Sequence, residues 1–159
     1  MKLMKVVTLS IIVSTLLVSC SQASHKPNDY EVVVDDLGTI FVAQAFQPQG
    51  ILKNNTDHTL EFTHGADMFT YVIYDDEDVL VKQENRILVQ NDIGYSVKLE
   101  ANQSYKNNGE EHRSKEHYQF TLNTPGQYRM KAKAVYYVNH EGRMEKKEIE
   151  SRLLDFTVR

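Results

Sequence analysis

Apolar and polar residues alternate along most of the chain after Tyr30, so the hydrophobic pattern has a period of two rather than 3.6. In the segments 60–63, 96–100 and 128–134, every second residue is apolar and its neighbours are polar. One apolar and one polar face is typical of half-buried antiparallel strands. Three other segments are apolar on both faces, as central strands are: 31–34, 40–46 and 69–74.

The last third of the chain predicts a long hairpin. Its tip is expected at 139–142, where Asn, His, Glu and Gly follow one another. This centring places Lys131 opposite Glu150. It also places Lys133 opposite Glu148. Opposite charges that face each other across a ladder contribute about 0.2–1 kcal/mol each, so these pairs would help to set the register.

Two further local signals concern the turns and the phase of the strands. The adjacent Leu153 and Leu154 break the alternation, so a β-bulge is predicted near Arg152–Leu153. Pro followed by Gly within Thr124–Gln127 predicts a type II turn. Short strands at regular spacing, with turns between them and no convincing helix, indicate an all-β fold: one immunoglobulin-like antiparallel β-sandwich over 30–159.

The first nineteen residues differ from the rest. Lys2 and Lys5 form a basic start, and Val6 to Val18 is a run of thirteen mostly apolar residues. A membrane-spanning helix needs about 20 apolar residues, so this run is too short to span. It has the length of a signal-peptide core.

The run ends in Leu17-Val18-Ser19-Cys20, which resembles the bacterial lipoprotein box. The resemblance implies that residues 1–19 are cleaved and that the thiol of Cys20 receives a diacylglycerol group and a palmitate. We therefore expect a lipid-anchored protein on the extracytoplasmic face of the cell membrane, with 20–29 as a polar tether. An inert Cys in a short buried helix is the alternative.

Charge and composition narrow the functional classes. The chain has 18 Lys plus Arg against 22 Asp plus Glu, a net charge of −4, which argues against a nucleic-acid binder. Removing Lys2 and Lys5 leaves 16 against 22, or −6. The single Cys excludes an internal disulfide and Cys-rich metal sites.

Candidate chemistry is sparse. None of the six His residues is spaced as a metal-ligand set, and we interpret all of them as surface residues. There is no nucleophile elbow and no Gly-rich phosphate loop, so we expect no enzyme, no cofactor and no metal. The acidic run 75–78 lacks the spacing of a calcium loop, and we interpret it as a solvated hairpin tip.

The candidate binding residues lie in the expected loops 64–68, 75–78 and 101–116. An exposed Tyr can anchor a protein partner, and carboxylates in loops can contribute to a binding surface. The candidates are Asp67, Asp75, Asp76, Glu77, Asp78 and Tyr105.

The order of strands and turns resembles the BsuPI-type intracellular proteinase inhibitor domain, an immunoglobulin-like sandwich. The resemblance rests on 55–63, 64–75, 97–104 and the Pro-Gly-Gln-Tyr of 125–128, and it extends over about 51–134. In place of the family's Pro-Gly, the chain has Ala101-Asn102. The resemblance implies inhibition of a serine protease by a loop lodged in the active-site cleft.

Three functions follow as hypotheses, of which the third, an envelope hydrolase, is kept only for completeness. The first is a membrane-anchored, non-catalytic module that binds an envelope protein. The alternative is an inhibitor of an extracellular or envelope serine protease. In either case the chain is expected to be a monomer, with Lys and Glu on its last hairpin guarding the sheet edge.

Overall fold

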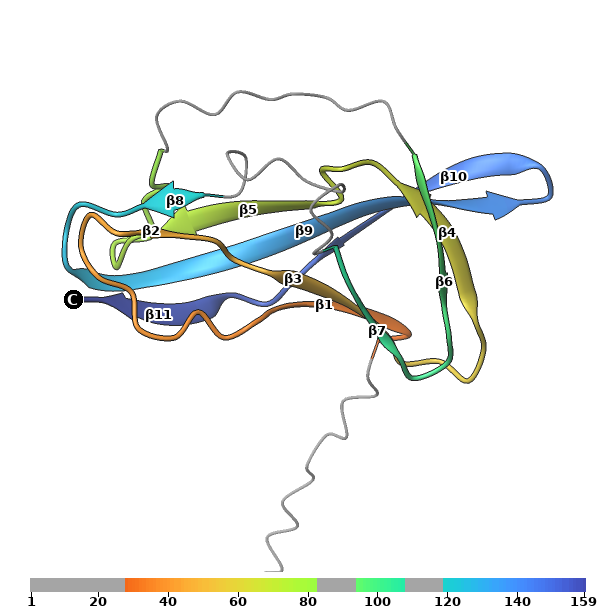
Figure 1. Cartoon of the computed structure of the whole chain (residues 1–159), viewed down its shortest axis with the longest axis horizontal. Helices are drawn as coiled ribbons and strands as arrows, with labels where there is room; N and C mark the ends of the chain where they lie inside the picture. Colours follow the sequence, from red (N-terminus) through yellow and green to blue (C-terminus); the bar gives the residue numbers. More distant parts are fainter. Residues whose placement is uncertain (1–27, 83–93, 108–118) are drawn as a thin grey trace, which may run out of the picture.

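The computed structural model describes residues 28–82, 94–107 and 119–159 (Figure 1). Within these ranges the regular structure consists of eleven β-strands and no helix, so the predicted all-β class is confirmed. The strands are β1 (Tyr30–Val34), β2 (Ala45–Phe46), β3 (Gly50–Asn54), β4 (Leu60–His64), β5 (Phe69–Tyr74), β6 (Tyr95–Leu99), β7 (Ser104–Lys106), β8 (Phe120–Thr121), β9 (Gly126–His140), β10 (Arg143–Glu150) and β11 (Leu154–Val158).

The strands form two main antiparallel sheets. The smaller sheet has the order β1-β3-β7, and the larger is built around β9. Because β9 is long, it pairs with β11 and β10 along one edge and with β5 and β4 along the other, while β6 continues beyond β4. Strands β2 and β8 form a separate ribbon. In Figure 1, β4 and β6 cross one end of the molecule, and the β9–β10 hairpin projects past them.

The hydrophobic core lies between the two sheets. The smaller sheet contributes Val32 and Leu52, and the larger contributes Phe69, Met130 and Tyr136, each at most 2% exposed. Alternate residues of β9 point inward, as the period-two pattern predicts. Two antiparallel sheets that share one core form a β-sandwich, which confirms the predicted architecture.

The entry into β9 has a feature of immunoglobulin-like sandwiches. The hydroxyl of Tyr128 donates a hydrogen bond of 2.8 Å to the carbonyl oxygen of Thr124, four residues upstream. Such a tyrosine corner holds the start of the corresponding strand in that fold. The predicted type II turn at 124–127 is wrong, because Gly126 has a φ of 157° and already pairs with Val158 as the first residue of β9.

The β9–β10 hairpin exists, but its register differs from the prediction by two residues. The turn consists of Glu141 and Gly142, whose φ angles of 53° and 82° fit a two-residue type I′ turn. This turn places Glu150 opposite Lys133 instead of Lys131. A shift of two residues keeps every side chain on its predicted face, since strand side chains alternate with a period of two.

The two expected charge pairs form all the same, as diagonal neighbours. Lys131 Nζ lies 2.8 Å from Glu150 Oε2, and Lys133 Nζ lies 3.6 Å from Glu148 Oε2. Diagonal partners across a ladder are within reach of long side chains.

The predicted bulge is present between β10 and β11. From Glu150 to Leu154 the chain advances four residues, while the partner on β9 moves only from Lys133 to Met130. Ser151 fills the break: its N–H donates to the carbonyl of Ala132, and its Oγ accepts the Ala132 N–H at 2.9 Å. The hydroxyl thus takes the place of a ladder carbonyl.

The expectation of a central strand over 40–46 is wrong. Only Ala45–Phe46 is a strand, and Phe41 is 52% exposed. The backbone turns at Ala43, which has a φ of 59°, and Val42 N–H bonds to the carbonyl of Arg159. Apolar residues in this segment therefore do not report a continuous strand. The other two segments expected to be central are edge strands. β1 is the edge of the smaller sheet. Among the described strands β5 pairs with β9 alone, and its Thr70 and Val72 are exposed.

The chain enters the sandwich beside the β3–β4 turn. Asn55 N–H donates to the carbonyl of Asp29, and Asn55 Nδ2 donates to the carbonyl of Asn28. The predicted signal peptide, Cys20 and most of the tether lie outside the described residues. Within the described ranges no helix has the length and apolar character to cross a membrane.

Candidate functional site

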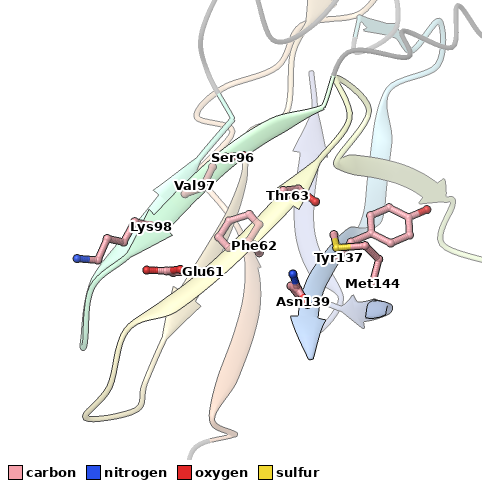
Figure 2. A pocket seen from close by; sticks show the side chains of 9 residues that line it. All are labelled: Glu61, Phe62, Thr63, Ser96, Val97, Lys98, Tyr137, Asn139 and Met144. Atoms are coloured by element: carbon pink, nitrogen blue, oxygen red, sulfur yellow. The ribbon is translucent and has the colours of Figure 1, made fainter. Parts of the chain in front are cut away.

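A groove lies on the outer face of the larger sheet, where β4 and β9 separate. The two strands pair only at Thr63 and Tyr137, and Figure 2 shows them diverging from that point. The hollow between them has a volume of about 380 Å³. Its lining comes from β4, β6, β9 and β10: Glu61, Phe62, Thr63, Ser96, Val97, Lys98, Tyr137, Asn139 and Met144.

The wall on the hairpin side is apolar and accessible. Tyr137 is 39% exposed and Met144 is 53% exposed. Tyr137 faces outward because its neighbour Tyr136 takes the inward position of the alternating strand. Tyrosine and methionine are enriched in protein interfaces, and the unbranched Met side chain adapts to irregular partners.

The opposite wall carries the carboxylate of Glu61, which has no cation partner among the described residues. Lys98 is the cross-strand partner of Glu61, but its Nζ lies 3.3 Å from Glu100 Oε1. Glu100 is held in turn by the Thr59 hydroxyl, which donates to its Oε2 at 2.7 Å. The bond from Thr59, followed by the contact with Lys98, lowers the pKa of Glu100. Among the described residues, Glu61 makes no ion pair.

The glutamates of β10, the neighbouring strand of the hairpin, are all paired. Glu145 lies 2.7 Å from Lys147. Glu148 lies 2.5 Å from Lys146, and Glu150 is paired with Lys131. Hydrogen bonds from these lysines lower the pKa of each carboxyl. Glu61 is therefore the exception among the glutamates on β4, β9 and β10 in the described part of the chain.

His64 is buried, which corrects the prediction that all histidines are surface residues. It is 1% exposed, and its ring centroid lies 5.9 Å from that of Phe62 and 5.5 Å from that of Tyr95. Its Nδ1 donates to the carbonyl of Gly65 at 2.6 Å, since a carbonyl can only accept. In the neutral ring Nε2 then accepts the hydroxyl of Tyr105 at 2.8 Å, so the contact joins β4 of one sheet to β7 of the other.

Tyr105, a candidate binding residue, is thus held by contacts within the sandwich. Its ring packs edge-on against Phe62 with centroids 5.5 Å apart, and burial raises the pKa of its hydroxyl. Asp67 is exposed in the β4–β5 turn, close to the end of β7 because Asn107 Nδ2 donates to the carbonyl of Ala66. These two candidates lie near each other but do not border the groove.

The acidic run lies at the other end of β5. Asp75 Oδ1 accepts the N–H groups of Glu77 and Val79, at 3.1 and 2.8 Å, which closes a tight turn. Asp78 forms an ion pair with Arg129, and Asp76 stays in the exposed part of the turn. The structure therefore does not bring the acidic run together with Asp67 or Tyr105.

Within the described residues, no cluster of three or more His, Cys, Asp or Glu side chains could hold a metal ion. The third candidate loop, 101–116, is described only as far as Asn107: it makes a turn from Glu100 to Gln103 and enters β7. Residues 108–116 lie outside the described ranges.

The groove was missed by the sequence reasoning. One signal was available: Tyr137 falls on the polar phase of β9, where an aromatic residue is out of pattern. Its neighbours across the groove come from β4 and β6, and no local motif connects them.

Comparison with known proteins does not assign this chain to a family. No known family model matches the chain, and no curated protein matches it. Among solved structures, it is similar to the CARDB domain of a Pyrococcus furiosus protein, crystallised in complex with di-metal ions. That likeness has 15% identity and a TM-score of 0.38, and it covers 82% of this chain and 92% of the other. At this level no ligand or activity of that domain transfers to this chain.

Proposed function

We propose that this chain is a membrane-anchored extracytoplasmic lipoprotein whose sandwich is a non-catalytic module that binds an envelope protein. The observation that carries the proposal is the groove beside Tyr137 and Met144, two large side chains left exposed on the larger sheet. Its lining contains Ser96 and Thr63 but no His that could activate a hydroxyl. Binding therefore fits the groove better than catalysis.

The anchor is proposed from the leader and from Cys20. If Cys20 is lipidated, the eight residues 20–27 reach at most about 28 Å at full extension. The sandwich would then stay close to the bilayer, with Asp29 held beside the β3–β4 turn. A partner of this module would accordingly be an envelope protein that is itself near the membrane surface.

Protease inhibition is the alternative implied by the BsuPI-type resemblance. Inhibition by insertion needs an extended exposed loop, whereas 65–68 and 75–78 are tight turns with internal hydrogen bonds. The stretch 101–107 is a short turn followed by β7. The described loops therefore favour a binding module.

The proposal can be tested in living cells with a photo-reactive amino acid. Placed at position 137 of the full chain, it should cross-link to a defined envelope protein. The matched position is Val72, which is 37% exposed on β5 of the same sheet but does not line the groove. Cys20→Ala should abolish palmitate labelling and reduce the adduct. Equal yields from positions 137 and 72, or palmitate labelling of Cys20→Ala, would contradict the proposal.

A further inference from the structure

We propose that the groove recognises an extended peptide segment of its partner in which a Lys or Arg stands two positions from an aliphatic residue. The cation pairs with the carboxylate of Glu61, and the aliphatic side chain packs on Tyr137 and Met144. This inference rests on the proposed protein-binding function and specifies the chemistry of the segment that is bound.

The need for a cation in the bound peptide follows from the ion pairs around the groove. Glu100, fixed by Thr59, draws Lys98 away from Glu61. The glutamates of β10 each have a lysine partner. Glu61 is the acidic residue of the groove lining, and within the described residues it makes no ion pair, so its carboxylate can attract an incoming cation. Where Arg or Lys approaches Tyr137, the ring face adds a cation–π attraction.

The spacing of two positions between the cation and the aliphatic residue of the peptide follows from the strand register. Thr63 pairs with Tyr137, so Glu61 lies two residues further along β4 and is diagonal to Tyr137. Diagonal neighbours across an antiparallel pair are about 7–8 Å apart, and the divergence of β4 and β9 widens this. In an extended peptide, side chains at i and i+2 share a face and are separated by about 6.6 Å. A long Lys or Arg side chain covers the difference.

The size of the groove also fits a peptide segment. Its volume of about 380 Å³ is at the lower end of ligand sites, which range from roughly 300 to 1,000 Å³. The exposed side chain of Met144, on β10, lines the groove together with Tyr137. A neutral oligosaccharide could hydrogen-bond to Ser96 and Asn139, but it carries no cation to pair with Glu61.

The test uses the full lipidated chain in detergent micelles, with methionine methyl groups labelled for NMR. The Met144 methyl signal reports binding of acetylated seven-residue peptides rich in Gly and Ser. The probe carries Lys and Val at i and i+2. Three matched peptides replace Lys by Glu, replace Val by Ser, or place Lys and Val side by side. The probe should move the Met144 signal at lower concentration than any of the three.

Charge reversal in the protein provides the decisive comparison. Glu61→Lys should invert the preference, so that the Glu peptide binds better than the Lys peptide. Glu77→Lys changes the net charge equally at an exposed residue outside the groove and should keep the original preference. Glu61→Gln should weaken binding of the probe about two- to fivefold, as expected for an exposed ion pair.

Three results would overturn the inference. If Lys and Glu peptides bind equally, or if Glu77→Lys alters the preference as much as Glu61→Lys, Glu61 does not select the segment. With either of these two results, cross-linking from position 137 in cells would still support the proposed function. If a neutral chito-oligosaccharide moves the Met144 signal and no peptide does, the partner is a glycan and the proposed function is wrong as well.

Discussion

Gly50, at the start of β3, lies against the ring of Phe69, and replacing it with Ala tests how closely the two sheets pack. A Cβ on Gly50 would lie 2.4 Å from Cδ1 and 2.6 Å from Cγ of Phe69. Gly50 has no left-handed φ, and at such positions Ala usually stabilises by about 0.4–1 kcal/mol through the unfolded chain. Overpacking a core costs about 1–3 kcal/mol, so Gly50→Ala should lower stability by ~0.5–2 kcal/mol.

Thermal unfolding followed by circular dichroism measures the effect, since 1 kcal/mol corresponds to about 3–5 °C in Tm for a domain of this size. Gly94→Ala is the matched control, because a Cβ there meets nothing within 4 Å. In a Phe69→Ala background both of these ring atoms are absent, and Gly50→Ala should cost little. If Gly50→Ala raises the Tm as the control does, or costs the same with and without the ring, the packing argument is refuted.

Two further predictions concern buried polar groups. Burial raises the pKa of the Tyr136 hydroxyl to about 12, while in the unfolded chain it is about 10. The folded state favours the neutral phenol over the phenolate. Its contribution to the free energy of unfolding is therefore complete below pH 10 and is lost as the pH rises from 10 to 12. Tyr136→Phe should make the fall of the urea midpoint over this range shallower, and a fall as steep as in wild type would contradict this. Ser151→Ala should destabilise by about 1–3 kcal/mol, because the buried N–H of Ala132 loses its acceptor; an unchanged urea midpoint would show that another group satisfies it.

Much of the strand pattern could be predicted because it depends on neighbouring residues. The alternation at 60–63 and 128–134 reports directly which side chains face a core, and both segments are strands. The bulge at Ser151 was visible for the same reason, since Leu153 and Leu154 break the phase. Segment 40–46 was mispredicted because apolar composition without alternation does not distinguish a strand from a loop folded against the core.

The hairpin shows where local information ends. The residues at 139–142 fit a turn made by 140 and 141, as predicted, and a turn made by 141 and 142, as observed, equally well. The positive φ angles of Glu141 and Gly142, together with the bond from Gly142 N–H to Asn139 Oδ1, select one of these turns. Either register places the same side chains inward, so the hydrophobic pattern could not discriminate between them.

The sequence by itself determined the all-β class, the inward and outward faces of the main strands and the expectation of a lipid anchor at Cys20, because each depends on short stretches of chain. Only the tertiary structure decided that His64 is buried against Tyr105 and that Glu61 borders Tyr137. The two pairs of residues come from segments 41 and 76 positions apart, and their proximity depends on how β4 crosses to meet β7 and β9. The groove exists because β4 and β9 pair at one position and then diverge, a geometry set by the packing of the whole sandwich rather than by any local motif.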